Sequence, residues 1–367
     1  WDAYKELKKE IDDFSEVLPM LKELSKPSVK TRHWEELSQV TGESLNFSSE
    51  EVFYLSRLLE INLLEYREEI EEIMESADKQ DKIEKKLNGI KEQWEVEIFD
   101  FDEFRGKYRL GSRTTEILEN LEESQNDLTT MNAMKHVTPF KNEVVHYLNL
   151  FSDVAETIDL WQKGQISWQS LEPVFTTGDI SRQMPTEARL FLTTDKTWGK
   201  IMERAVEDQK VIQCCQNEML KNLLPSLKEK LDSCQRSLDN YLYSKRNKFA
   251  RFFFVSDPVL LSILSQGSEP TAIQPFLENL FDAISRVKFD SRDRKLITHM
   301  MSNIGSDYEP IELTEPLKAE GNIEDWLKKL EEEMKKTMKE ILRNASRDCM
   351  QLPFLNFVNK HCAQASL

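Results

Sequence analysis

Glycine and proline are scarce in this sequence. Its 367 residues include only 10 glycines and 12 prolines, whereas 31% of the residues are charged. Leucine, glutamate and lysine dominate the long segments between these few helix breakers, a composition typical of solvated helices. The sequence also contains no repeat of fixed period and no low-complexity tract. We therefore expect a mainly helical protein with only short β-structure.

Cysteine is also scarce, and long apolar runs are absent. The five cysteines are odd in number and none is spaced as Cys-x-x-Cys, so we expect reduced thiols in a cytosolic compartment. No apolar run approaches the roughly 18 residues that a membrane span needs, and we predict no membrane partner. The sequence starts at Trp1, without an initiator Met or a signal peptide, and it stops at Leu367 after an apolar segment. We expect both ends to be cuts in a longer polypeptide.

Positive charge is in deficit. The 49 Lys and Arg residues are outnumbered by 66 Asp and Glu residues, which gives a formal net charge of -17. A chain of this charge is poorly suited to neutralise a phosphate backbone or another acidic surface. We therefore predict no nucleic-acid partner.

Motifs of catalysis and metal binding are missing as well. Residues 106–113 have the Gly-x-x-x-x-Gly spacing of a phosphate loop, but Ser112 and Arg113 stand where such a loop needs Lys and then Ser or Thr. A tight turn between helices explains the glycines more simply. No His lies three or four residues from another His or a Cys, as a helical metal site requires. We predict no catalytic, cofactor-binding or metal-binding residue, and hence no enzymatic activity of these residues themselves.

The strongest pattern in the sequence is a heptad seam. Its apolar residues alternate in steps of four and three, which predicts a long helix: Leu220, Leu224, Leu227, Leu231, Cys234, Leu238 and Tyr241. Three cations close this helix, where they favour the negative end of its dipole: Lys245, Arg246 and Lys248. The helix therefore ends near residue 248.

A junction follows the heptad helix. Phe249 and the run Phe252–Val255 are bulky and apolar, so we predict a buried, extended segment there. Asp257 is the predicted N-cap of a new helix with Pro258 at its first position, and this helix runs to about Gln266, before Gly267.

Apolar periodicity predicts the other elements. An amphipathic helix over residues 1–27 carries Tyr4, Leu7, Ile11, Phe14 and Leu18 on one face and breaks near Pro19. Further helices are predicted at 30–40, from a capping box at Ser48 and Glu51, and at 65–74, 79–98, 114–131, 139–171, 195–205, 276–287, 292–304 and 323–343. Pro173 ends one of them, residues 174–190 are rich in turn formers, residues 99–111 form a small β element or a looped crossing, and residues 311–316 an edge strand stopped by Pro316. The predicted fold class is mainly α, an elongated series of antiparallel helix bundles with a few short β-strands.

Several segments resemble dynein heavy chains. The junction sequence from Lys245 to Asp257 is similar to the "KR..FPRFFF.SD" signature of the linker that precedes the ATPase ring in that family. Ala250 stands where the family usually has proline. Five further blocks resemble the family in the same order along the chain: 30–34, 161–175, 179–185, 195–202 and 320–326. Residues 254–258 and 357–364 resemble axonemal, outer-arm-type heavy chains more than the cytoplasmic form.

The resemblance implies a mechanical function. It predicts a linker with an N-terminal helical part over 1–112, a central long-helix bundle over 113–248 and a C-terminal part over 249–367 that leads towards the AAA+ ring. The linker of this family bends and straightens over that ring, and so produces the power stroke of an ATP-driven, minus-end-directed microtubule motor. ATP and Mg would bind in AAA+ modules downstream of Leu367. The implied location is the cytoplasmic cytoskeleton of a cilium or flagellum, in its axoneme.

The resemblance also implies the partners. They are the chain's own AAA+ ring, and dynein intermediate and light chains that bind mainly through an upstream tail. Microtubules would be contacted only through the distant stalk, which agrees with the acidic charge of these residues.

Candidate hinge or docking residues lie at the junction: Lys245, Arg246, Lys248, Ala250, Arg251, Phe252, Phe253, Phe254, Asp257 and Pro258. The basic residues among them either cap the helix or dock on acidic residues of a neighbouring module. A bending linker needs a flexible join, and the two candidates are residues 173–194 and 243–256, of which we favour the second. The alternative function is a non-motor helical scaffold or tether that acts only by binding proteins, but such proteins typically have a repeat period.

Overall fold

The computed structural model describes residues 2–43, 61, 63–177, 180–266, 269–302 and 309–361. The described chain forms two compact units. Unit 1 comprises residues 1–104, 109–159 and 205–220, and unit 2 comprises residues 105–108, 160–204 and 221–367. The three-part division at residues 112 and 248 is a different partition, and it stays a prediction. Each unit is described below by itself.

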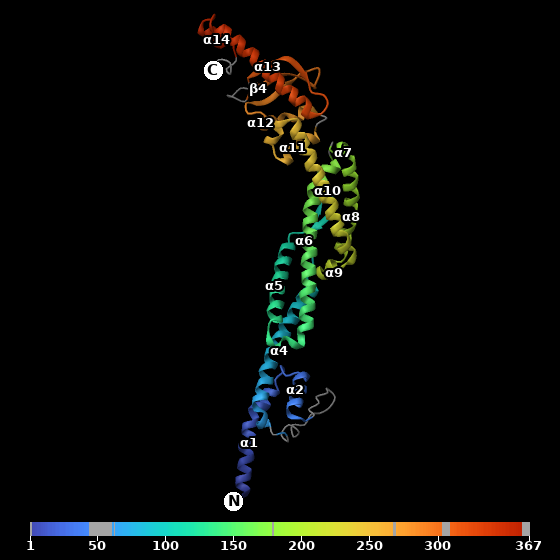
Figure 1. The fold of residues 1–367 in the computed structure, drawn as a ribbon, viewed down its shortest axis with the longest axis vertical. Helices are drawn as coiled ribbons and strands as arrows, with labels where there is room; N and C mark the ends of the chain where they lie inside the picture. The colour runs from blue at the N-terminus through green and yellow to red at the C-terminus, as the bar shows by residue number, and fades with distance from the viewer. Residues whose placement is uncertain are drawn as a thin grey trace. The chain divides into compact units, whose positions relative to one another are not determined.

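Unit 1 begins with a helical cluster. It contains α1 (Asp2–Leu24), α2 (Thr31–Thr41), the 3-10 helix η1 (Leu63–Tyr66) and α4 (Arg67–Val96) (Figure 1). Gly42 ends α2 with a left-handed φ of 73°, as a C-cap glycine does. Apolar residues from all four helices share one buried core: Met20, Leu24, Leu37, Leu63, Ile70, Ile73 and Met74. The predicted capping box at Ser48 and Glu51 lies outside the described residues.

The rest of unit 1 is built on α4. The strands β1 (Phe101–Phe104) and β2 (Lys107–Leu110) form a two-stranded sheet, followed by α5 (Thr114–Asn132), η2 (Lys135–Phe140) and the first half of α6 (Lys141–Thr177). Trp94 is buried between these helices, with its ring centroid 5.2 Å from that of Phe151 and its Nε1–H donated to Ser124 Oγ at 2.9 Å. The backbone N–H of Phe99 donates to the Gln209 carbonyl just before α9 (Val211–Gln216).

Unit 2 contains the heptad helix and most of the tryptophans. The helices α7 (Ile180–Gln183), α8 (Pro185–Glu207) and α10 (Glu218–Lys248) pack with the second half of α6. The predicted seam of α10 is buried from Leu220 to Leu238, and Tyr241 is half-buried. Trp161, Trp168 and Trp198 are fully buried, so these aromatic residues are core, as their helical spacing indicates.

The C-terminal half of unit 2 combines short helices with a sheet. After α10 come η3 (Ala250–Phe254), α11 (Asp257–Ser265), η4 (Pro270–Phe276) and α12 (Leu277–Leu280). The strands β3 (Ile284–Phe289), β4 (Leu296–Ser302) and β5 (Pro310–Lys318) form an antiparallel sheet in that order. The helix α13 (Ile323–Cys349) packs against β5, and α14 (Phe354–Lys360) follows it (Figure 1). The predicted class, mainly α with a few short strands, is confirmed.

Predicted helix ends at prolines and polar residues were wrong. Pro19 and Pro173 both lie inside continuous helices, α1 and α6. Apolar packing continues past each proline, with Leu24 and Phe175 buried, and so offsets the hydrogen bond that proline removes. The predicted pair of helices at 65–74 and 79–98 is the single helix α4. Most of the turn-rich segment 174–190 is also helical.

Two predicted helices, 276–287 and 292–304, were wrong. Only α12 in the first is α-helical, and β3 and β4 occupy most of the remainder. Val287 and Ile297 are β-branched and buried, and pairing along the sheet outweighs helix propensity. The edge strand β5 is confirmed, but it runs through Pro316 to Lys318. Pro316 lies where the β4–β5 register shifts, so its missing N–H removes no regular ladder bond.

Candidate functional site

The end of α10 is tied to the start of α13 by a buried ion pair. Lys245 Nζ donates to Glu324 Oε1 at 2.6 Å, and Lys248 Nζ lies 3.3 Å from the same oxygen. The side chains of Lys245 and Glu324 are 8% and 0% exposed, whereas that of Lys248 is 54% exposed. Two elements that are 75 residues apart in the sequence are therefore joined at one carboxylate.

This ion pair is enclosed by aromatic and apolar groups. Lys245 Nζ lies 5.2 Å from the centroid of the Tyr241 ring, a cation–π distance. Burial raises the pKa of Tyr241, and the Glu324 carboxylate raises it further. Buried charges cost free energy unless they are paired and hydrogen-bonded, and one oxygen, Glu324 Oε2, has no hydrogen-bond partner. Removing either Lys245 or Glu324 should therefore lower the free energy of unfolding, because the other charge would stay buried without its partner.

Arg246 fixes the chain between α10 and α11. Its Nε donates to the Phe252 carbonyl at 3.2 Å and its Nη2 to the Val255 carbonyl at 3.0 Å. The same Nη2 lies 2.7 Å from Asp257 Oδ1. These carbonyls lie where no regular helix ladder runs, so a guanidinium with several donors is suited to satisfy them.

Arg251 links the junction to the end of α12 and to α13. Its Nη1 donates to the Leu280 carbonyl at 3.0 Å, and its guanidinium lies 4.8 Å from the Phe281 ring centroid. Its Nε is 3.3 Å from Glu331 Oε1. Burial alone would raise the pKa of Glu331, but the hydrogen bond from Lys335 and the charge of Arg251 bring it below its usual value. Glu331 therefore stays ionised beside its two cations.

The aromatic run is not buried as a whole. Phe249 and Phe252 are buried with ring centroids 5.0 Å apart, but Phe253 and Phe254 are 54% and 71% exposed. The predicted extended segment was wrong because residues 250–254 form the 3-10 helix η3, whose turn points successive side chains in different directions. The Tyr243 ring packs edge-on against Phe253 at 6.3 Å.

The start of α11 differs by one residue from the prediction. Ser256 is the N-cap, Asp257 is the first helical residue and Pro258 the second. Asp257 still lies in the first turn, where a carboxylate favours the positive end of the helix dipole. Ala250 opens η3, and the preceding Phe249 has the extended φ and ψ of -129° and 97°.

Sequence reasoning found the cations of this site and missed their acidic partners. Glu324 and Glu331 lie 79 and 80 residues after Lys245 and Arg251, too far for any local pattern to pair them. Glu324 lies in the block 320–326, and the resemblance of this block to the family is the feature of the sequence that could have pointed to Glu324. The basic residues dock on acidic side chains, but those side chains belong to the same unit rather than to a neighbouring module.

Two other family-like blocks meet in a second polar cluster of unit 2. The Trp168 Nε1–H donates to Asp195 Oδ1 at 2.9 Å, and Lys107 pairs with Oδ2 of the same carboxylate. The Trp168 and Trp198 rings stack with centroids 5.5 Å apart. Arg105 Nη1 lies 2.8 Å from Glu172 Oε2. Residues of these blocks thus hold the segment 105–108 in place.

The phosphate-loop spacing does not form a phosphate loop. Gly106, with φ of 78°, lies in the turn between β1 and β2, and Gly111 follows β2. A Cβ at Gly111 would lie 2.2 Å from Asp100 Oδ2, and this oxygen also accepts the Arg113 backbone N–H at 3.3 Å. A carboxylate of the protein therefore occupies the position that an anion would need. Gly106 is thus a turn residue, but the predicted turn between helices was wrong, because this turn joins the strands β1 and β2.

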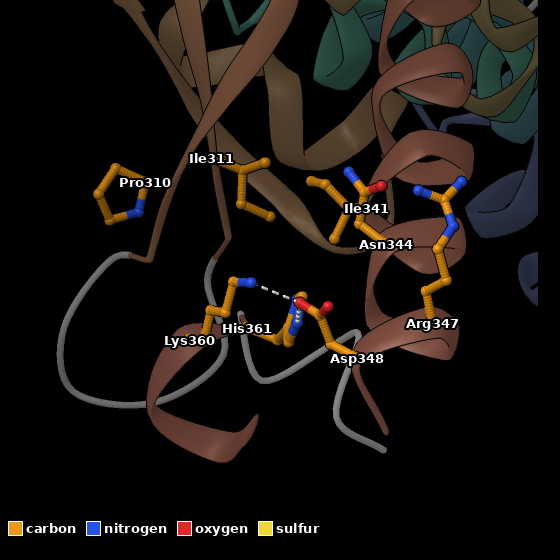
Figure 2. A pocket seen from close by; sticks show the side chains of 8 residues that line it. All are labelled: Pro310, Ile311, Ile341, Asn344, Arg347, Asp348, Lys360 and His361. Carbon is orange, nitrogen blue, oxygen red and sulfur yellow. Dashed lines mark hydrogen bonds and ion pairs between the residues drawn. The ribbon is translucent and has the colours of Figure 1, made fainter. Parts of the chain in front are cut away.

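A pocket of about 400 Å³ lies between β5, α13 and α14 (Figure 2). Lys360 Nζ and His361 Nε2 lie 2.7 and 2.9 Å from Asp348 Oδ2. Hydrogen bonds from these two groups lower the pKa of Asp348. The carboxylate is thus the point that fastens the end of α14 to α13.

The described residues offer no cluster of three His, Cys, Asp or Glu side chains that could hold a metal ion. Among the helices of the described part of the chain, none has the length and hydropathy of a membrane span. The described junction is held together by the ion pairs of Lys245, Arg246 and Arg251.

A sequence model described as "Dynein heavy chain, N-terminal region 2" matches residues 1–345. The chain belongs to the dynein heavy chain family. It is 41% identical over 372 residues to "Dynein gamma chain, flagellar outer arm" of Chlamydomonas reinhardtii, with all of this chain and 8% of that protein covered. It is 39% identical over 373 residues to "Dynein axonemal heavy chain 5" of Rattus norvegicus, with all of this chain and 11% of that sequence covered.

A third relative in the dynein heavy chain family is "Dynein axonemal heavy chain 8" of Mus musculus. It is 40% identical over 365 residues, which cover 97% of this chain and 8% of the mouse protein. The chain therefore spans about a tenth or less of the length of these relatives. The resemblance read from the junction and the five other blocks is confirmed at the level of the family.

Proposed function

We propose that residues 1–367 are the mechanical linker of an ATP-driven, minus-end-directed microtubule motor. The linker bends and straightens over the AAA+ ring of the same heavy chain. Membership in the dynein heavy chain family carries this proposal. Long helices with buried seams support it, because α4, α6, α10 and α13 are each 27 residues or longer and a lever needs stiff elements.

The proposed bending point is the segment 243–256. Outside the ladders of α10 and η3, its backbone hydrogen bonds run from the N–H groups of Phe249, Phe252 and Val255 to carbonyls three or four residues earlier. Side-chain ion pairs of Lys245, Arg246 and Arg251 supply the remaining cohesion. Ion pairs can exchange partners in a way that a packed apolar core cannot, so this segment can adopt a second arrangement. The other candidate segment, 173–194, is α-helical over most of its described residues, whereas 243–256 includes the change from α10 to the 3-10 helix η3, which favours 243–256.

The motor's chemistry is proposed to lie outside these residues. ATP and Mg bind in the AAA+ modules of the heavy chain, and microtubules bind at its stalk. Intermediate and light chains bind mainly through the tail. The names of the relatives, which include "axonemal" and "flagellar outer arm", support a location in the axoneme of a cilium or flagellum. A non-motor helical tether would not be expected to match this family along its whole length.

Hydrogen exchange in the complete heavy chain tests the bending point. Exchange of backbone amides is compared between the nucleotide-free state and the state with ADP and vanadate. We expect the largest change over residues 243–256 and almost none over residues 79–96 of α4, which serve as the internal control. The proposal would be contradicted if the change in amide exchange between the two states were the same in both segments.

A further inference from the structure

The helix α1 exposes an apolar seam to solvent. Residues at steps of three and four form one stripe along it, and every one is a large apolar side chain. The exposed fractions are 65% for Tyr4, 57% for Leu7, 56% for Ile11, 43% for Phe14 and 53% for Leu18. Scattered exposed apolar residues are ordinary, but a contiguous stripe of five indicates a binding surface. The predicted face of α1 thus exists, but the described part of unit 1 does not bury it.

This seam is distinct from the face that packs in unit 1. At about 100° per residue, the seam is centred about 110° around the helix axis from the packed face. The packed face consists of Val17, Met20, Leu21 and Leu24, which contact the core with Ile70 and Ile73 of α4. The C-terminal turns of α1 are therefore anchored by one face, and the seam lies on another.

The spacing of the seam specifies the kind of partner. Alternating steps of three and four over Tyr4 to Leu18 are those of a coiled-coil seam. A membrane-surface helix would carry a wider apolar face and a predominantly basic polar side, whereas the polar side of α1 mixes Lys5 and Lys9 with Asp12, Asp13 and Glu16. The partner is thus a second helix with its own seam.

The charges beside the seam argue against a second copy of this chain. Lys8 and Glu10 flank the seam about 80° to either side. In an antiparallel pair of copies that overlaps the whole seam, Lys8 would lie opposite Ser15, which has no carboxylate to pair with it. In a parallel pair in register, Glu10 would face Ser15, which has no charge to offer. A complementary helix carries a carboxylate opposite Lys8 and a cation opposite Glu10.

We propose that α1 residues 4–18 pair with a second heptad helix of the same heavy chain, outside residues 1–367. This inference rests on the proposed function, in which these residues are one segment of a much longer polypeptide; the relatives extend about ten-fold further. A seam of two heptads is too short to pair well between separate molecules. Within one polypeptide the effective concentration reaches the millimolar range, which makes so short a pairing stable.

A photo-crosslinking experiment tests this pairing. Benzoylphenylalanine replaces Phe14 in the complete heavy chain, and a matched variant carries it at Glu16, on the opposite, exposed side of α1. We expect the position 14 variant to crosslink at least tenfold more than the position 16 variant. Mapping by mass spectrometry should place the crosslinks in a heptad-patterned segment of the same molecule.

Heavy chains of two isotopic compositions, mixed before irradiation, identify the source of the partner. Mixed-isotope crosslinks would show a second copy, and crosslinks to another subunit would show a separate partner; either result, or equal yields at both positions, overturns the proposal. Lys8→Glu together with Glu10→Lys should lower the yield at least fivefold, whereas Lys8→Arg should leave it unchanged. The crosslinks are measured without ATP or microtubules, so their yield does not depend on whether residues 1–367 act as a lever.

Discussion

Replacing Lys245 by methionine tests the buried ion pair at the junction. The change Lys245→Met removes the ammonium but leaves the fully buried Glu324 carboxylate, with only the more distant Lys248 at 3.3 Å. Breaking one side of a buried pair costs about 3–5 kcal/mol. Because Lys248 remains, we expect the free energy of unfolding of unit 2 to fall by about 3 kcal/mol, at the lower end of that range.

A double-mutant cycle separates this cost from simple packing loss. Replacing both partners, Lys245→Met with Glu324→Leu, removes the stranded charge, so the free energy of unfolding should return to within about 1 kcal/mol of wild type. The matched control on the same helix is Lys228→Met, because Lys228 pairs with Asp232, whose side chain is 44% exposed. An exposed pair of this kind contributes about 0.5 kcal/mol or less.

Urea unfolding followed by hydrogen exchange measures these variants, with peptides from residues 241–248 and 323–330 as local reporters. We predict a coupling energy of about 2 kcal/mol or more between Lys245 and Glu324. If the cost of the double variant equals the sum of the two single variants, the two groups do not act as a pair, and the explanation of the junction fails.

Three further predictions concern other residues. Burial lowers the pKa of His33 below its ordinary value, and its Nδ1 accepts the Lys30 N–H at 2.9 Å. Because His33 takes up a proton at higher pH in the unfolded chain than in the folded one, unit 1 should lose thermal stability as pH falls below about 6.5. His33→Gln should remove this dependence of thermal stability on pH. Ala250→Pro should raise the free energy of unfolding, measured with urea, by about 0.4–1 kcal/mol. Residue 249 is already extended, and proline is tolerated at the first position of a helix. A fall in the free energy of unfolding of more than about 1 kcal/mol would show that the Ala250 N–H is needed. Burial raises the pKa of the Cys234 thiol to about 11. Iodoacetamide at pH 7.5 should therefore alkylate the exposed Cys349 at least about a hundredfold faster than Cys234. Equal alkylation rates would contradict the burial of Cys234.

Much of the helical architecture could be predicted from local spacing. The seam of α10 and the apolar face of α13 repeat every three or four residues over many turns, and a long periodic signal is hard to mistake. The strands β3 and β4 were missed because each is a short run in which buried residues such as Val287 and Ile297 fit a helix or a strand equally well. Only pairing with distant residues decides between the two.

The candidate site could be located but not completed from the sequence. The density of cations and aromatic residues at 245–254 marks a segment in which Lys245 and Arg251 form ion pairs, and its role as a hinge or docking point stays a prediction. The acidic partners Glu324 and Glu331 lie on a helix about 80 residues away, and charged residues on amphipathic helices usually face solvent. Exposure of Phe253 and Phe254 also depends on the 3-10 geometry of η3, which the sequence of five largely apolar residues does not encode.

Microtubule gliding by the complete heavy chain tests whether residues 1–367 act as the lever. Wild-type protein is compared with a variant that lacks residues 1–367, and ATP hydrolysis is measured in parallel. We predict that gliding velocity falls at least tenfold while ATP hydrolysis persists within a few-fold of wild type, because we propose that these residues transmit force and that the nucleotide sites lie elsewhere. Gliding at the wild-type velocity without residues 1–367 would contradict the assignment of this segment as the lever.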